Sequence, residues 1–345
     1  MKTRITEMLG ISYPIFLSGM SWISVPEMVA AVSNAGGLGI LATGPLDKDT
    51  TRKSIKRIRA LTDKPFGANA SLLFPGAREN AQILLEEQVP VINFALGKGD
   101  WIVQEAHKYG GKVMATVVSA RHARRAEEYG CDAVIATGNE AAAHGEFVTT
   151  FCLIPSLVDA LKIPVVAAGG IADGRGLAAA LALGAEGVAM GTRLMTTRES
   201  PLHQSFKDLS IAKDVTDTLY SRRFDGLWCR VLKTDSAERM IRKGLDLPAA
   251  FFNSQDIAKS LHLPYIKLFI GVLLSGWKNA KQLAYLANAS NAIKLATEKG
   301  DLTRGVLPVG QCTGLLKDEP TVAELFERIV KEAESVKNRM TGVFS

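Results

Sequence analysis

The sequence has few cysteines and no long apolar run, and each of these scarcities argues against a class of protein. Its four cysteines are far apart and form no Cys-x-x-Cys pair, so neither a disulfide framework nor a bound metal is expected. No stretch approaches the roughly 18 apolar residues of a membrane span. The nearest, LFIGVLL at 268–274, predicts a buried helix or an apolar pocket wall. The first residues lack the apolar core and cleavage site of a secretion signal. We therefore expect a cytoplasmic protein with reduced thiols and no membrane partner.

The sequence also has only a small excess of positive over negative charge. Lys and Arg number 41 against 35 Asp and Glu, a formal net charge of +6. The basic residues are scattered singly, and aromatic residues do not interleave with them as they do on a nucleic-acid platform. We therefore expect a mildly basic solvated surface and no nucleic-acid partner, although the excess would favour an anionic cofactor or substrate.

Short apolar runs recur at a near-constant interval through the first part of the chain. They occupy residues 14–18, 38–42, 66–72, 89–95, 112–118, 132–137, 163–170 and 186–192. Segments of helical periodicity separate them, and several end in a glycine, as the C-terminus of a helix prefers. Strands that alternate with helices predict right-handed crossovers and a parallel sheet. Eight repeats predict an α/β protein with a closed (β/α)8 TIM barrel; an open doubly wound sheet is the alternative.

The alternation stops after Arg198. Residues 205–310 are richer in charge and helix formers, whereas residues 318–340 have an acidic, proline-containing start and then apolar positions at helical spacing. We expect residues 1–204 and 311–345 to form the barrel, with the last helix covering it. The segment 205–310 would be a smaller, mostly helical insert domain after strand eight that covers the barrel mouth.

Glycines follow the seventh and eighth predicted strands. Gly169 and Gly170 follow the seventh, and Gly191 precedes Thr192 at the end of the eighth. The loops at these two strands commonly form a phosphate site in barrels. Glycine lets main-chain N–H groups approach a phosphate, and a helix start adds partial positive charge. Two such loops favour a phosphate site over tight turns alone.

Polar groups and a sulfur follow two other predicted strands. Gly19, Met20 and Ser21 come after the first strand and offer main-chain donors and a polarizable thioether to a flat ring. The third strand carries Asn69 and Ser71. Because asparagine is disfavoured inside strands, Asn69 indicates a ligand or a loop bridge. With the phosphate site, this set suits flavin mononucleotide (FMN).

One histidine stands out in the segment ATGNEAAAHGE, residues 136–146. His144 follows the sixth predicted strand and so lies at the catalytic face of the barrel. The alanines let a ligand approach, and imidazole exchanges protons near neutral pH. The alternative is a surface histidine capped by Glu146. Glu140 either orients His144 or faces solvent, and the sequence does not decide between these.

Several motifs occur together in order: SGMSW, NAGGLG, FGANASL, GNEAAAHGE, AAGGIADGRGLAAALALGAEGVAMGTR and GLLKDEP. With them, the chain resembles the nitronate monooxygenase (2-nitropropane dioxygenase) family of FMN enzymes, which includes NAD(P)H:quinone reductases and is related to flavin-dependent enoyl-acyl carrier protein reductases. The resemblance implies that His144 is the catalytic-site histidine. It also implies FMN contacts by Gly19, Met20, Ser21, Asn69, Ser71, Thr116, Ala142, Ala168, Gly169, Gly170, Gly191, Thr192 and Gln311.

Two positions depart from the family pattern. Thr116 stands on the fifth strand where several relatives have a lysine near the flavin, and Thr137 stands where some relatives have an acidic residue. A cation beside the flavin ring would stabilise its anionic reduced form, so Thr116 predicts altered redox behaviour.

The resemblance implies a small-molecule substrate and three alternative functions. The first is oxidation of alkyl nitronates with FMN and O₂. The second is reduction of a quinone or an enoyl thioester with NAD(P)H as co-substrate. The third, from another class, is a flavin-binding protein without turnover. A homodimer is compatible with each of them.

Overall fold

The computed structural model describes residues 1–142, 144–262, 264–274 and 276–344. Its main sheet has eight parallel strands in the order β1-β8-β7-β6-β5-β4-β3-β2. They are β1 (Ile15–Leu17), β2 (Gly39–Ala42), β3 (Phe66–Ser71), β4 (Val91–Ala95), β5 (Lys112–Val117), β6 (Ala133–Thr137), β7 (Val165–Ala168) and β8 (Gly187–Met190). A parallel bridge between Phe16 and Leu38 joins β1 to β2. The closed (β/α)8 barrel is thus confirmed, and the open-sheet alternative is wrong.

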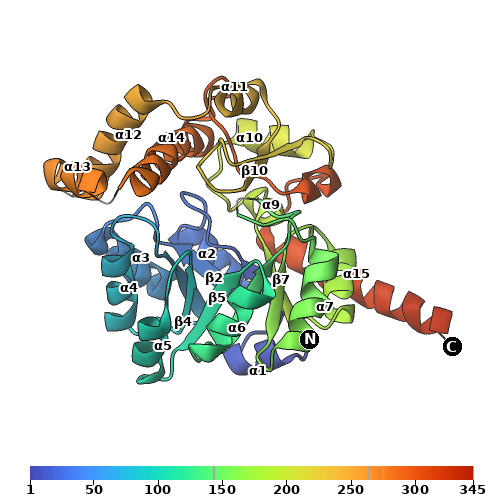
Figure 1. Cartoon of the computed structure of the whole chain (residues 1–345). Coiled ribbons are helices and arrows are strands. Elements are labelled where there is room, and N and C mark those ends of the chain that lie inside the picture. The colour runs from blue at the N-terminus through green and yellow to red at the C-terminus, as the bar shows by residue number, and fades with distance from the viewer. Residues whose placement is uncertain (143, 263, 275, 345) are drawn as a thin grey trace.

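Helices alternate with these strands and cover the outside of the barrel (Figure 1). They are α2 (Pro26–Asn34), α3 (Lys48–Leu61), α4 (Ala77–Glu86), α5 (Asp100–His107), α6 (Ala120–Glu128), α7 (Thr150–Ala160), α8 (Gly174–Ala182) and α15 (Val322–Phe344). Apolar side chains of strands and helices form one continuous core between the two layers. This packing explains the uninterrupted apolar runs, because parallel strands are buried on both faces.

The last helix completes the ring of helices. α15 packs against α8 and α2, which follow β7 and β1. Its Phe326 is buried, and a Cβ built on Gly37 would lie 2.6 Å from that ring, so only glycine permits this close approach. Glu332 accepts a hydrogen bond from the N–H of Gly174 at 2.9 Å. α15 therefore occupies the place of the eighth covering helix.

The short helix α1 (Arg4–Leu9) closes the other end of the barrel. Its buried Ile5 and Leu9 belong to the cluster that fills the barrel interior, together with Phe16, Ile40 and Val166. Figure 1 shows α1 below the barrel and the segment after β8 above it. A ligand can therefore reach the interior only from the carboxyl ends of the strands.

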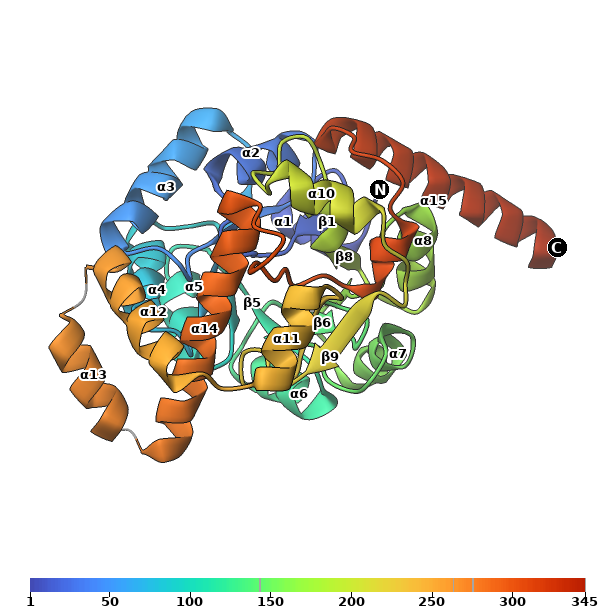
Figure 2. The ribbon, with the colours of Figure 1, turned by 90° about the horizontal axis from the view of Figure 1, so that it is seen from above.

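The segment above the barrel is more varied than the sequence pattern indicates. Its elements are α9 (Thr192–Met195), α10 (Gln204–Ile211), β9 (Thr218–Ser221), β10 (Cys229–Leu232), α11 (Asp235–Lys243), α12 (Leu247–Ser260), α13 (Tyr265–Leu274), α14 (Trp277–Lys299) and a 3-10 helix η1 (Gln311–Leu315). β9 and β10 form an antiparallel hairpin that the sequence pattern does not predict. Seen from above in Figure 2, α14 and α11 cross over the barrel mouth. That this segment is a domain of its own stays a prediction.

The apolar run at 268–274 lies in α13, and the structure corrects one expectation about it. Val272 lines the main cavity, whereas Ile270 is 50% exposed and Leu274 is 81% exposed. α13 is therefore not a buried helix, and Val272 supports the alternative of an apolar pocket wall. The side chains at 268, 269, 271 and 273 lie outside those that the structure describes. Among the described helices, none has both the length and the apolar content needed to cross a bilayer.

Burial separates the four cysteines into two groups, and this predicts their reactivity. Cys131, Cys229 and Cys312 are buried, whereas Cys152 on α7 is exposed. Burial raises the pKa of Cys131 to about 12 and that of Cys312 to about 11, and it raises the pKa of Cys229 well above its usual value. Because the thiolate is the reactive form, we expect only Cys152 to react rapidly with Ellman's reagent in the folded protein at mildly alkaline pH.

The control for this prediction is the unfolded chain, in which all four thiols should react. The variant Cys152→Ser should remove the fast phase of the folded protein. A second fast-reacting thiol in the wild type would contradict the burial pattern.

Candidate active site

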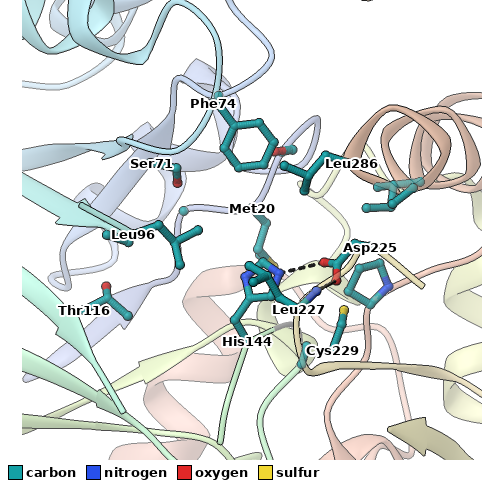
Figure 3. A pocket seen from close by; sticks show the side chains of 18 of the residues that line it. Met20, Ser71, Phe74, Leu96, Thr116, His144, Asp225, Leu227, Cys229 and Leu286 are labelled. Atoms are coloured by element: carbon teal, nitrogen blue, oxygen red, sulfur yellow. Dashed lines mark hydrogen bonds and ion pairs between the residues drawn. The ribbon is translucent and has the colours of Figure 1, made fainter. Parts of the chain in front are cut away.

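A cavity of about 1480 Å³ lies between the carboxyl ends of the barrel strands and the helices above them. Its lower wall consists of strand ends and the loops that follow them, and its upper wall includes residues of α12 and α14. Figure 3 shows side chains from both walls pointing into the same space. This is the face at which barrel enzymes carry their active sites.

The cavity brings together nearly all of the residues that the sequence singles out. The lining contains Gly19, Met20, Ser21, Asn69, Ser71, Thr116, Ala142, His144, Ala168, Gly169, Gly170, Gly191 and Thr192. Gln311 is the exception, because only its neighbours Gly310 and Cys312 line the cavity. The main-chain N–H of Gln311 donates to the carbonyl of Glu140 at 2.9 Å, so this residue ties η1 to the loop after β6.

The glycines after β7 and β8 form a cradle that fits a phosphate. Gly169 (φ 109°) and Gly170 (φ 76°) adopt backbone conformations that favour glycine. Among the described hydrogen bonds, none has the main-chain N–H of Gly169, Gly170 or Gly191 as donor. The side chain of Thr192 helps to hold η1, because its Oγ1 accepts from the N–H of Gly310 at 2.9 Å. The cradle therefore offers main-chain donors to an anion.

The start of α8 does not contribute to this cradle. The carboxylate of Asp173 caps the helix by accepting from Arg175 and Gly176, and Glu332 accepts from Gly174. Two carboxylates thus occupy the N–H groups of that helix end. A phosphate would meet the main chain of the β7 and β8 loops instead.

Close packing fixes the loop after β1, which lies beside the cradle. A Cβ on Gly19 would lie 2.8 Å from the amide of Asn69, and a Cβ on Gly191 would lie 3.3 Å from the sulfur of Met20. Asn69 is held by Thr43, whose N–H donates to Oδ1 at 3.3 Å and whose hydroxyl donates to the main-chain oxygen at 2.6 Å. The first loop therefore lies against the third and eighth strands, beside an amide and a thioether that suit a flat ring.

Thr116, which the resemblance marks as a departure from the family pattern, has an uncharged polar neighbour. The amide of Asn93 donates to Oγ1 of Thr116 at 3.1 Å and to the carbonyl of Met114 at 3.2 Å. Both Asn93 and Thr116 line the cavity. The β4 and β5 side of the site is therefore polar and uncharged at these positions.

The most specific feature is a hydrogen bond between His144 and Asp225. Nε2 of His144, on the loop after β6, lies 2.7 Å from Oδ2 of Asp225, on the loop between β9 and β10 (Figure 3). Asp225 is 4% exposed, and its Oδ1 accepts from the N–H of Leu227 at 3.0 Å. A carboxylate at this position favours the tautomer with the proton on Nε2, which leaves Nδ1 as the basic nitrogen.

The β9–β10 hairpin holds the His144 loop at two further points. Arg230 donates to the carbonyl of Asn139 at 3.0 Å and to its side-chain oxygen at 2.7 Å. The hydroxyl of Tyr220 donates to the carbonyl of Gly145. Arg230 also lies over the ring of Tyr220, and Trp228 stacks on Tyr220 with the ring centroids 5.0 Å apart. The backbone on both sides of His144 is thus anchored to the hairpin.

The sequence left open whether Glu140 orients His144 or faces solvent, and the structure shows that it bonds Thr150 instead. Its carboxylate accepts from the N–H and the hydroxyl of Thr150 at 2.8 and 2.9 Å. It therefore fixes the start of α7 and does not orient His144. That task falls to Asp225, which no sequence motif singled out.

Cys229 lies next to His144 and Asp225, and among the described residues these three form a group of possible metal ligands. Their ligand atoms lie within 4.8 Å of one another. The pKa of the Cys229 thiol is raised by burial first and by the negative charge of Asp225 second. Because metal ligands must be deprotonated, a protonated thiol makes this set a poor metal site near neutral pH.

The residues that sequence reasoning missed are Asp225, Arg230 and Tyr220. They lie in the segment YSRRFDGLWCR, where charges stand among aromatic residues. A charged residue that is buried requires a polar partner, so charges among aromatic residues indicate that this segment contacts polar groups elsewhere. The sequence gives no sign that the partners lie in the loop after β6.

These features define an enzyme: a barrel with a glycine cradle and a hydrogen-bonded histidine–aspartate pair at one mouth. The sequence model of the family described as nitronate monooxygenase matches residues 2–83 and 76–332. The chain belongs to this family, and the resemblance seen in the motifs is confirmed.

Known proteins similar to this chain are oxidoreductases with different names. A Rhodococcus jostii (strain RHA1) protein is 38% identical over 96% of both chains and is named (3aS,4S,5R,7aS)-5-hydroxy-7a-methyl-1-oxo-octahydro-1H-indene-4-carboxyl-CoA dehydrogenase. The structure of FabK from Thermotoga maritima superposes with a TM-score of 0.84, 36% identity and 99% coverage of both chains. A Staphylococcus aureus (strain N315) probable nitronate monooxygenase is 32% identical over 72% of this chain and 82% of its own length. The chain is therefore an oxidoreductase whose substrate the comparisons leave open.

The contact between His144 and Asp225 predicts that Asp225→Asn impairs turnover without unfolding the protein. An asparagine can donate to Nε2 through its amide, which favours the tautomer with the proton on Nδ1 and removes the base. In a serine protease triad the same exchange costs about 10⁴-fold in kcat. We expect kcat to fall by at least about 10-fold with little change in KM, because Asp225 positions His144 and does not bind substrate.

Two companion variants test this interpretation. Asp225→Glu keeps the acceptor and should recover part of the lost kcat. Asp235→Asn changes an exposed carboxylate at the start of α11 and should leave kcat unchanged. Equal activity of Asp225→Asn and the wild type would rule out a positioning role.

Proposed function

We propose that this protein is an FMN-dependent oxidoreductase that transfers hydrogen to or from the acyl chain of a thioester. The observation that carries this proposal is the size of the cavity. At about 1480 Å³ it exceeds the volume of most ligand pockets, which is about 300–1,000 Å³. A second large molecule fits beside a flavin, whereas a small alkyl nitronate would leave most of this space empty.

The upper part of the cavity has the character that an acyl chain requires. Phe251 and Ile257 of α12, Leu283 and Ala287 of α14, and Phe74 after β3 line it. An acyl chain bound against this surface would be stabilised by about 25 cal/mol for each Å² of apolar surface removed from water. The Rhodococcus jostii relative is named for the CoA thioester of a bulky ring system, and a substrate of that class would use this wall.

The residues of the lower wall fit FMN. Gly169, Gly170 and Gly191 offer the main-chain donors for its phosphate, and Met20 and Asn69 lie beside the place for its ring. When bound, FMN supplies hydride transfer. We propose NAD(P)H as the co-substrate in the reductive direction.

His144 supplies the proton chemistry. Reduction of an enoyl thioester adds a hydride at the β-carbon and a proton at the α-carbon, and the reverse reaction removes both. Nδ1 of His144 is the ring nitrogen that Asp225 leaves available for this proton. Because the helices above the barrel cover the site, the proton exchanges with the histidine and not with bulk water.

Nitronate oxidation, the first function implied by the sequence, is the second candidate. The family match and the Staphylococcus aureus relative favour it. His144 would then hydrogen-bond the anionic oxygens of the nitronate or remove a proton from the neutral nitroalkane. The cavity volume is the reason for placing the thioester first.

The two candidates differ in what reduces and reoxidises the flavin. We expect the absorbance of the purified yellow protein to bleach under anaerobic conditions with NADH or NADPH, and to return when crotonyl-CoA is added. Stopped-flow absorbance measures both steps. Bleaching by propyl-2-nitronate and not by either nicotinamide would establish nitronate oxidation in place of the thioester proposal.

A second prediction concerns His144 itself. The variant His144→Ala should retain the flavin spectrum, because the proposed cradle lies elsewhere, and should lose at least about 10²-fold in turnover, as expected for general acid–base catalysis. Flavin reduction by NAD(P)H should survive while reoxidation by the enoyl thioester slows. With nitroalkanes, the loss should be larger for the neutral acid than for the nitronate.

His107→Ala is a matched control for this experiment. His107 also hydrogen-bonds a carboxylate, that of Asp132, at 2.9 Å, but it lies at the end of α5 and away from the cavity. Its loss should leave turnover unchanged. Wild-type rates for His144→Ala with every donor and acceptor would remove the histidine from the mechanism.

A further inference from the structure

The net charge of the chain is confined to the segment that covers the barrel. Residues 205–310 contain 16 Lys and Arg against 10 Asp and Glu, whereas the remaining residues contain 25 of each. The rest of the chain is therefore formally neutral, and the whole excess of +6 lies in the sequence of the covering segment. A charge distribution of this kind attracts anions to the cavity mouth.

Two cations of this segment reach the cavity without a carboxylate partner. The basic residues that line it are Arg125, Arg222, Lys281 and Lys294. Arg125 pairs with Glu128 at 3.1 Å, and Lys294 lies 3.9 Å from Glu298. In the part of the chain that the structure describes, Arg222 and Lys281 form no ion pair, and both are exposed. Their charges are available to a ligand.

The elements that carry these cations meet beside the active site. Arg222 belongs to the β9–β10 loop, three residues before Asp225, and Lys281 lies on α14 next to Gln282. The amide of Gln282 donates to the main-chain oxygen of Asp225 at 2.8 Å and so joins α14 to this loop. The two cations therefore line the cavity from two elements that this hydrogen bond joins.

The acidic residues that line the cavity do not pair directly with these two cations. Asp225 is buried and bonded to His144. Glu146 and Asp256 also line the cavity, and both are exposed. Neither forms an ion pair with Arg222 or Lys281 among the described residues. The cavity thus combines two exposed cations, which form no ion pair among the described residues, with an apolar wall.

We propose that Arg222 and Lys281 bind phosphate groups on the carrier of the substrate, with the acyl chain lying along the apolar wall. This inference rests on the proposed thioester function and names the carrier as coenzyme A. Coenzyme A bears a diphosphate and a 3′-phosphate at the end opposite its thiol, so its charged end stays at the mouth while the acyl group reaches His144. NAD(P)H also carries phosphates and is the other ligand that these cations would suit.

The test compares two thioesters that differ only in the phosphorylated part. Crotonyl-CoA carries the phosphates, and crotonyl-pantetheine lacks them. For Arg222→Gln combined with Lys281→Gln we expect KM for crotonyl-CoA to rise about 5- to 10-fold at low ionic strength, a range typical of lost charge contacts. KM for crotonyl-pantetheine, KM for NADPH and kcat should stay at wild-type values. The difference should shrink as salt is added, because exposed charges are screened.

Lys299→Gln is the matched control, since Lys299 is an exposed cation at the far end of the same helix and does not line the cavity. It should leave every KM unchanged, which separates local binding from the loss of net charge.

The outcomes distinguish the alternatives. A rise in KM for NADPH alone would reassign the cations to the nicotinamide and overturn the proposal. Equal KM values of the double variant and the wild type for crotonyl-CoA would also overturn it. A wild-type enzyme that turns over neither thioester would contradict the proposed function itself, independently of the two cations.

Discussion

The hydrogen bond between His144 and Asp225 connects the barrel to the segment that covers it. The two residues are 81 positions apart in the chain, and each lies on a loop that other bonds hold in place. Because the partner of the histidine comes from the covering segment, the histidine acquires its orientation only when that segment lies on the barrel. The orientation of His144 thus depends on how the covering segment packs on the barrel.

The surrounding hairpin makes this contact rigid. Arg230 is buried, and the desolvation lowers the pKa of its guanidinium from a normal value far above neutral, so the side chain stays charged. A buried charge is stable only where hydrogen bonds replace water. The two oxygens of Asn139 and the hydroxyl of Thr218 provide these bonds, and they also fix the start of the His144 loop. The same interactions that permit burial of the arginine therefore position the histidine.

The cavity divides its tasks between two walls. The lower wall has the glycine cradle and the polar groups of the barrel strands, and the upper wall has the apolar surface and the free cations of the covering segment. Relatives of this chain carry names as different as a CoA dehydrogenase and a nitronate monooxygenase. One fold can carry such different activities, because function depends on the site and not on the fold.

The sequence alone determined the barrel, its covering helix, the glycine cradle and the histidine at the mouth. Each of these depends on a local pattern: apolar runs at regular spacing, glycines directly after strands, or a residue placed by the strand before it. Only the tertiary structure decided which carboxylate meets His144. Glu140, four residues away, bonds Thr150, whereas Asp225 arrives from the unpredicted β9–β10 hairpin. The exposure of α13 and the position of Gln311 outside the cavity lining were likewise decided by packing. Such contacts depend on how distant segments lie together in space, and local sequence periodicity carries no information about that arrangement.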